Sequence, residues 1–358
     1  MPGPQHESRR LCLPLTAWPA VDRASWSAAI RRGDLLLDDG PAGHLKPGSL
    51  RKHAAGYGRW LTWLGEAARI EEEHDPAARA TPQRVAAFIA TLRQLNAPRT
   101  VLSRVTDLAT VLGWFAPERD WGWLDRILAR LRGRVRPVRD KRSRLRSAHE
   151  LLALGRRLMQ TATADDETPP LALRERARLY RDGLMIACLA LRPLRLANFA
   201  QLELGRDLVQ RGDGWWLEIA AARTKTGEPI EVPFPQDLEP ALQSYLATWR
   251  PRLARVEYLR GNRALWPTQR GTTISSGHAF NTIVAHTRAA FAKPVNPHLF
   301  RDAAATTIAL DCPDQVRMAA RLLGHRSFAT TERYYNLARA AEAARAWQKI
   351  LDRLRGKG

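Results

Sequence analysis

Four side chains near the end of the sequence have the types and the spacing needed to cut a phosphodiester. His298 and Arg301 lie three residues apart, His325 follows in a Leu-Gly-His sequence, and Tyr334 stands nine residues after it. A guanidinium and two imidazoles can hold and polarise a phosphate, and a phenol can attack it. The set predicts strand cleavage through a covalent phosphotyrosine.

The charge of the chain agrees with a polyanionic partner. Lys and Arg number 57 against 36 Asp and Glu, a formal net charge of +21. An excess of this size favours nucleic-acid binding and says little about the fold. Cys12, Cys188 and Cys312 lie far apart, so they predict neither a disulfide framework nor a zinc site. With no secretory segment and no apolar run long enough to span a bilayer, we expect a cytoplasmic protein.

Short helices are expected to carry the reactive residues. Asn296 followed by Pro297 is typical of a helix start, which predicts a helix over residues 297–310 with His298 and Arg301 on one face. Gly324 is typical of the residue just past a helix end, which places His325 in the turn between helices at 313–323 and 328–354.

The chain ahead of these helices predicts a mainly α domain with a small antiparallel β-sheet. Helical periodicity marks residues 171–191, 237–254 and 276–291, whereas strands are indicated at 215–219 and 229–234. Ser147 and Glu150 form a capping box that opens this domain, residues 147–358.

The N-terminal part divides into three segments. Residues 1–45, with Trp18 and Trp26, are interpreted as an arm of unassigned role. Apolar residues spaced four and three apart between Leu50 and Leu64 predict a helical bundle over residues 46–132. Residues 133–146 form a basic linker, either merely solvated or laid across a DNA backbone. The linker cations predicted to contact DNA are Arg134, Arg136, Arg139, Lys141, Arg142 and Arg144.

On these motifs the chain resembles the tyrosine recombinases, the phage integrase family, from about residue 45 to 345. The resemblance adds two residues to the candidate site. Arg195, within Pro-Leu-Arg-Leu-Ala-Asn, matches the first catalytic Arg of the family. Lys225, between the two predicted strands, matches the Lys at the tip of the family's β-hairpin. Asn198 stands where the family commonly has an acidic residue, and Asp302 where it often has a second His.

The resemblance also implies the role of each site residue. Arg195 and Arg301 would clamp the non-bridging phosphate oxygens, Lys225 would protonate the departing 5′ oxygen, and His298 would accept or position the Tyr proton. His325 would hydrogen-bond the phosphate and Tyr334 would attack it. The alternatives from the residues themselves are Arg192 for Arg195, Arg223 for Lys225 and Tyr335 for Tyr334.

The expected partner is double-stranded DNA with inverted half-sites, bound by a homo-oligomer with two copies per site and four in synapsis. An apolar stripe from Leu337 to Leu354 either docks into a neighbouring copy or packs on its own domain. No cofactor is expected, because a phosphotyrosine conserves the energy of the phosphodiester and the sequence has no P-loop. The function predicted is site-specific recombination. Relaxation of the type IB topoisomerase kind and non-catalytic DNA binding remain alternatives.

Overall fold

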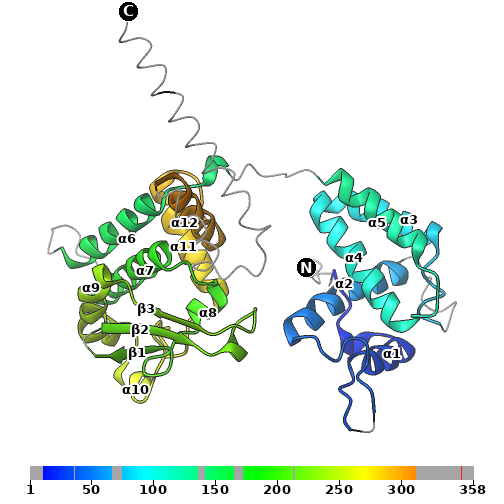
Figure 1. Ribbon diagram of the computed structural model, residues 1–358, viewed down its shortest axis with the longest axis horizontal. Coiled ribbons are helices and arrows are strands. Elements are labelled where there is room, and N and C mark those ends of the chain that lie inside the picture. The colour runs from blue at the N-terminus through cyan, green and yellow to red at the C-terminus, as the bar shows by residue number, and fades with distance from the viewer. Residues whose placement is uncertain are drawn as a thin grey trace, which may run out of the picture. The chain divides into compact units, whose positions relative to one another are not determined.

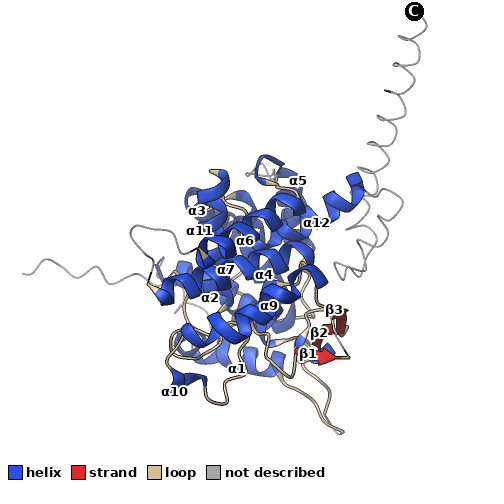
Figure 2. Ribbon diagram, turned by 90° about the vertical axis from the view of Figure 1, so that its left-hand side faces the viewer, coloured by secondary structure: helices blue, strands red, loops and turns tan. Residues whose placement is uncertain are grey.

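The computed structural model describes residues 11–35, 37–66, 75–135, 142–164, 172–212, 214–311 and residue 348. The chain divides into two compact units, Met1–Arg139 and Asp140–Gly358. The described part is mainly helical, with one small antiparallel sheet in the second unit, which confirms the predicted fold class (Figures 1 and 2). Within the described ranges no helix is both long and apolar enough to cross a membrane.

The first unit is a helical bundle built around aromatic side chains. Thr81 accepts a hydrogen bond from the Arg84 backbone N–H at 3.2 Å, so the predicted N-cap begins α3. The edge of the Trp18 ring packs against Trp26, with centroids 5.4 Å apart, and both belong to the bundle core. The helices are α1 (Ala20–Ile30), α2 (Pro47–Glu66), α3 (Pro82–Leu95), α4 (Pro98–Phe115) and α5 (Gly122–Arg134).

A buried ion pair fixes α1 to the rest of this bundle. Asp22 is fully buried and accepts hydrogen bonds from Arg79 at 2.9 Å and from the Tyr57 hydroxyl at 2.7 Å. Burial, and next the nearby Asp22 charge, raise the pKa of Tyr57 well above its ordinary value. Tyr57 therefore stays protonated and serves as a donor. Residues ahead of position 45 thus supply both core side chains and a buried charge.

The second unit surrounds the buried helix α7. Every residue from Tyr180 to Ala190 is buried, as the apolar run in the sequence predicted. Its helices are α6 (Ala148–Thr163), α7 (Leu173–Leu191), α8 (Leu196–Ala200), α9 (Glu239–Ser244), α10 (Val256–Leu259), α11 (Ser276–Phe291) and α12 (Pro297–Asp311). The strands β1 (Leu208–Arg211), β2 (Gly214–Ile219) and β3 (Ile230–Pro233) form an antiparallel sheet in the order β1-β2-β3.

Two glycines bring α6 and α7 into direct backbone contact (Figure 1). A Cβ added at Gly155 would lie 2.6 Å from the Gly183 carbonyl oxygen, and one at Gly183 would lie 2.6 Å from the Gly155 oxygen. No other residue fits at either position without moving a helix. The Ser147–Glu150 capping box is present as predicted at the start of α6. The end of α7, where the candidate site begins, is therefore held by close packing along the helix.

The structure differs from the predicted elements at β1 and at the helix predicted over residues 237–254. Strand β1 was not predicted, because its sequence, Leu-Val-Gln-Arg, does not alternate between apolar and polar residues. The predicted helix at 237–254 is divided into α9, a π-helical turn (Tyr245–Trp249) and a 3-10 turn (Arg250–Arg252). The predicted helices at 313–323 and 328–354 lie outside the described residues, apart from residue 348.

Candidate active site

Helix α12 presents His298 and Arg301 at its start. The Asn296 side chain accepts hydrogen bonds from the backbone N–H groups of His298 and Leu299, at 3.1 and 3.2 Å, so the predicted Asn-Pro cap is confirmed. Leu299 and Phe300 are buried in the core, whereas His298 is exposed. The apolar pair between them thus anchors the first turn that carries the imidazole and the guanidinium.

The loop that leads into α12 is fixed from two sides. Thr287, buried on α11, accepts a hydrogen bond from the Val295 N–H at 3.0 Å, and its hydroxyl lies 3.1 Å from the Val295 carbonyl oxygen. Arg144 donates two hydrogen bonds, of 2.9 and 2.7 Å, to the Pro294 carbonyl. Ala292 adopts a left-handed conformation with φ of 57° as the chain leaves α11. Together these contacts determine where α12 begins.

Arg301 connects this helix to the segment that carries Arg195. The Arg301 side chain is buried, and its Nη1 donates to the Pro193 carbonyl oxygen at 2.6 Å. Pro193 lies two residues before Arg195, in the turn between α7 and α8. Two arginines far apart in the sequence therefore belong to one local structure, as the two-arginine clamp requires.

Arg195 itself stands at the N-terminal boundary of α8, with an extended backbone. Its neighbours Leu194 and Phe199 are buried, and the Phe199 carbonyl accepts a hydrogen bond from the Trp266 indole N–H at 3.0 Å. The side chain of Arg195 is half-buried. The packing around it fixes its backbone, which limits the positions that its guanidinium can reach.

The alternative Arg192 has a different role. Its Nε donates to the Pro233 carbonyl at the end of β3, at 3.1 Å, and its Nη1 donates to the Leu191 carbonyl at 3.2 Å. Partial burial lowers the pKa of Arg192 from its ordinary value. These bonds tie the end of α7 to the sheet, so Arg195 is the better candidate for the clamp.

Lys225 lies in the connection between β2 and β3, which pair as an antiparallel hairpin. The buried Thr224 beside it donates to the carbonyl oxygens of Ala221 and Glu228, at 3.0 and 2.8 Å. Gly227 completes the loop with φ of 76°, a conformation that favours glycine. Lys225 is exposed at this pinned loop, as a candidate proton donor to DNA has to be.

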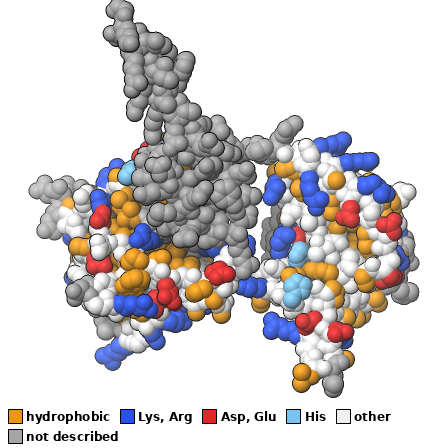
Figure 3. Space-filling model, in the orientation of Figure 1, with side chains coloured by type: hydrophobic (Ala, Val, Ile, Leu, Met, Phe, Trp, Pro, Cys, Tyr) orange, Lys and Arg blue, Asp and Glu red, His pale blue; other side chains and the backbone are white. Residues whose placement is uncertain are grey.

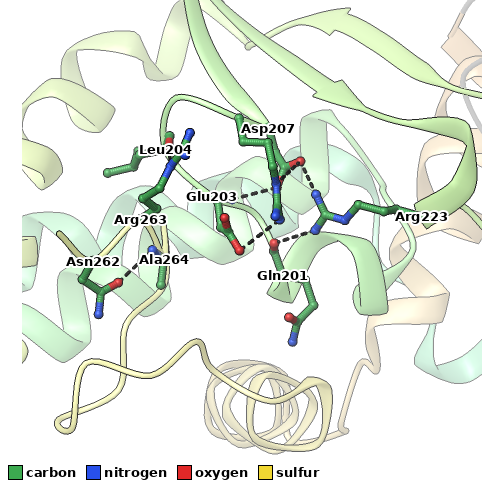
Figure 4. A network of polar contacts seen from close by, with 9 residues as sticks. Gln201, Glu203, Leu204, Asp207, Arg223, Asn262, Arg263 and Ala264 are labelled. Atoms are coloured by element: carbon green, nitrogen blue, oxygen red, sulfur yellow. Dashed lines mark hydrogen bonds and ion pairs between the residues drawn. The ribbon is translucent and has the colours of Figure 1, made fainter.

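The alternative to Lys225, Arg223, is held in a polar network under the same loop (Figure 4). Its Nη1 pairs with the buried Asp207, and its Nη2 donates to the Gln201 carbonyl at 2.9 Å. Arg206 also pairs with Asp207, at 3.2 Å. The Asp207 carboxylate thus holds the base of the loop, which makes Arg223 a supporting residue and leaves Lys225 as the candidate acid.

Comparison with known proteins identifies the family of the chain. The family model described as "Phage integrase family" matches residues 157–341, just over half of the chain. The chain belongs to the phage integrase family. The matched range contains all six candidate site residues, including His325 and Tyr334, which lie outside the described residues.

Tyrosine recombinases are among the relatives of this family member. XerD of Mycobacterium tuberculosis (strain CDC 1551 / Oshkosh) is 36% identical over 113 residues, which is 31% of this chain and 35% of that protein. XerD of Pseudomonas putida is 29% identical over 163 residues, 45% of this chain and 51% of that protein. The chain thus spans about a third to a half of the length of these relatives. A solved lambda integrase dimer bound to a COC′ core site has 16% identity and a TM-score of 0.49, covering 82% of this chain and 90% of that one.

Two linker cations of this family member have different surroundings. Arg134 is exposed in the last turn of α5, whereas Arg144 makes the contact with Pro294. Arg136, Arg139, Lys141 and the side chain of Arg142 lie outside the described part of the structure. The contact between these cations and DNA stays a prediction. No sequence pattern predicted the Arg144–Pro294 contact, since it joins segments 150 residues apart.

Arg144→Ala is expected to destabilise the second unit and to slow DNA cleavage. Two charge-assisted hydrogen bonds are lost, and a half-buried arginine of this kind contributes about 1–2 kcal/mol. Thermal unfolding should show a lower Tm, and cleavage should slow because the loop before His298 loosens. Arg134→Ala is the matched control. It should leave the Tm unchanged and reduce the salt slope of DNA binding by about 0.9. A changed salt slope with an unchanged Tm for Arg144→Ala would contradict the assignment.

Proposed function

We propose that this member of the phage integrase family is a site-specific DNA recombinase that cuts and rejoins strands through a 3′-phosphotyrosine on Tyr334. The hydrogen bond from Arg301 to the Pro193 carbonyl, at 2.6 Å, is the observation that carries the proposal. It supports a clamp of Arg195 and Arg301 on one phosphate. Lys225 on its pinned loop supports proton delivery to the same group.

The proposed step exchanges one phosphodiester for another. The Tyr334 oxygen attacks the phosphorus, a phosphorus–oxygen bond forms, and the bond from phosphorus to the 5′ oxygen breaks. His298 accepts the phenolic proton or positions it, and Lys225 donates a proton to the departing 5′ oxygen. The reverse attack, by the 5′ hydroxyl of the same or another strand, restores the DNA. Bond energy is conserved throughout, so rejoining is as accessible as cutting.

Two arginines suit the charge that develops in this step. Negative charge grows on the non-bridging oxygens as the fifth ligand approaches phosphorus, and a planar guanidinium binds two oxygens at once. Arg301 is held in place before DNA binds, because it is buried and hydrogen-bonded. A preorganised donor of this kind needs little rearrangement at the moment of reaction.

A basic depression elsewhere on the second unit also favours a polyanionic partner. A cavity of about 570 Å³ has Arg178, Arg181, Arg270 and His278 in its lining. Its one carboxylate, Asp182, already pairs with Arg181 at 2.8 Å and lies 3.1 Å from the His286 ring. The lining thus keeps an excess of positive charge, and Figure 3 shows further Lys and Arg on the visible faces of both units. This distribution supports DNA backbone binding beyond the cleaved phosphate.

The assembly we propose follows from the two-unit organisation. The helical bundle and the catalytic unit both bind one half-site, two copies occupy an inverted pair, and two such duplexes form a four-copy synapse. The basic linker between residues 133 and 146 contributes to binding of the phosphate backbone. The helix predicted after Tyr334 would connect neighbouring copies.

A pair of plasmid assays tests the function. One plasmid carries two copies of the target site, and the other is supercoiled and carries a single copy. Recombinant products from the first plasmid are the expected result. Relaxation of the second without any exchange would favour the topoisomerase alternative, and binding without cleavage of either would favour the non-catalytic one.

A further inference from the structure

A hairpin after α1 presents leucines to solvent. The chain leaves α1 and returns through hydrogen bonds from the N–H groups of Gly40 to Arg31, at 2.9 Å, and of Ala42 to Ala29, at 2.8 Å. At its tip, the Asp34 N–H donates to the Leu37 carbonyl at 3.0 Å. This segment, residues 31–35 and 37–42, is called the leucine hairpin below, and it projects from the first unit beyond α1 (Figure 1).

The leucine hairpin is preformed. A Cβ at Gly33 would lie 2.1 Å from the Leu37 carbonyl oxygen, so the two arms approach as closely as backbone allows. The Gly33 N–H donates to Asp39 Oδ1 at 2.7 Å, and the Leu37 N–H donates to Asp34 Oδ1 at 3.1 Å. A loop held by so many bonds loses little entropy when a partner covers it.

Its tip combines apolar and acidic side chains. Leu35 is fully exposed and Leu37 is 54% exposed, so neither side chain belongs to the core of the bundle. Asp34, Asp38 and Asp39 flank them, in a protein whose net charge is +21. The nearest cations in the sequence, Arg31 and Arg32, stand at the base of the hairpin. Exposed leucines inside an acidic frame fit an apolar depression edged by cations.

The second unit has a depression of that kind, a cavity of about 470 Å³ beside β1. Its apolar lining consists of Leu204, Leu208, Val209, Trp215 and Leu246. Arg250 lines it as well, and the guanidinium of Arg263 stands beside it, since a Cβ at Gly205 in the lining would lie 3.4 Å from Arg263 Nη2. This depression is called the β1 pocket below.

The two arginines of the β1 pocket keep their charge available. Arg250 donates to the carbonyl oxygens of Asn262 at 2.7 Å and Ala264 at 2.9 Å, and Arg263 donates to the Leu204 carbonyl at 3.0 Å. Among the described residues neither pairs with a carboxylate. Carbonyl partners orient a guanidinium without neutralising it, so an acidic group at the rim gains from both.

We propose that the leucine hairpin of one copy docks into the β1 pocket of a second copy, with its aspartates against Arg250 and Arg263. The match of apolar tip to apolar lining, and of acidic frame to basic rim, selects a second copy of this chain as the occupant. The contact joins two different surfaces, so it runs head to tail and extends past a dimer or closes into a ring. It requires neither DNA nor strand cleavage and goes beyond the proposed recombinase activity.

Sedimentation of the full chain without DNA tests this contact, with a mixing arm. Wild-type protein should form dimers and larger species as its concentration rises. A hairpin variant, Leu35→Ser with Leu37→Ser, and a pocket variant, Arg263→Glu, should each associate about tenfold more weakly or worse. Mixed together they should form dimers and nothing larger, because one intact hairpin meets one intact pocket.

Matched controls separate this contact from general stickiness. Leu95→Ser removes a similarly exposed leucine at the end of α3, and Arg260→Glu reverses an exposed charge outside the β1 pocket. Both should associate like wild type, and thermal melting should show every variant folded. If the Arg263→Glu protein is unfolded, Leu246→Asp takes its place. Monomeric wild-type protein at all concentrations, or a mixture that stays monomeric, overturns the proposal. So does a hairpin variant that still associates as wild type does, or a hairpin held in the pocket of its own chain.

Discussion

Tyr334→Phe is expected to abolish covalent capture of DNA, while Tyr335→Phe retains it. Phenylalanine keeps the ring and removes the one oxygen that can attack phosphorus, so the loss should be complete rather than partial. The measurement uses nicked suicide duplexes that carry the target site, from which the cut strand diffuses away and leaves protein attached. Denaturing gels then count the protein–DNA adduct.

The two adjacent tyrosines make the experiment its own control. Both lie within the range matched by the family model, residues 157–341, so family membership does not choose between them. The Thr-Thr-Glu-Arg-Tyr sequence and the distance from His325 favour the first. Capture that survives Tyr334→Phe but disappears with Tyr335→Phe would shift the nucleophile by one residue and leave the rest of the proposal standing.

Arg301→Ala should slow cleavage at saturating DNA by about a hundredfold or more, because losing one preorganised donor costs roughly 3 kcal/mol. It should also lower the Tm, since the Pro193 carbonyl loses its 2.6 Å hydrogen bond. Arg195→Ala should slow cleavage to a similar extent with a smaller loss of stability, because that side chain is half-buried. Single-turnover cleavage, DNA affinity and thermal melting are measured on each variant.

Arg192→Ala is the matched comparison for both arginines. Arg192 lies three residues before Arg195, between α7 and α8, but bonds to the Pro233 carbonyl at 3.1 Å. Its loss should therefore affect stability more than the rate of cleavage. Arg301→Lys keeps the charge and loses the planar fork, and should recover little activity. If Arg195→Ala weakens DNA affinity alone and cleaves normally at saturation, the clamp is wrongly assigned.

Local signals in the sequence predicted the structure well wherever a side chain bonds the backbone of a residue a few positions away. The Thr81 cap, the Ser147–Glu150 box and the Asn296-Pro297 start each depend on residues within a few positions of one another. Caps of this kind depend only on the local sequence, so they can be predicted without the tertiary structure. The same holds for α7, whose long apolar run required burial.

Such local patterns do not predict contacts between segments that are distant in the sequence. The bond from Arg301 to Pro193 ends on a backbone carbonyl, and every residue has one, so no residue type marks the acceptor. The contact of Arg144 with Pro294 could not be predicted for the same reason, because it also ends on a backbone carbonyl. Nothing in the sequence distinguishes Arg144 from the other cations of the linker. Trp18 and Trp26 were visible in the sequence, but which core they would enter depended on the packing of α1.

The buried pair of Asp22 and Arg79 decides where this protein can be divided. A fragment or chimaera that began at residue 46 would respect the helical periodicity, yet it would discard Asp22, the carboxylate that pairs with the buried Arg79. Removing one member of such a pair costs about 3–5 kcal/mol, a large share of the roughly 5–15 kcal/mol by which native proteins are typically stable. A bundle intended for exchange between members of the family therefore has to be joined ahead of Leu11, whose carbonyl accepts a hydrogen bond from Arg59.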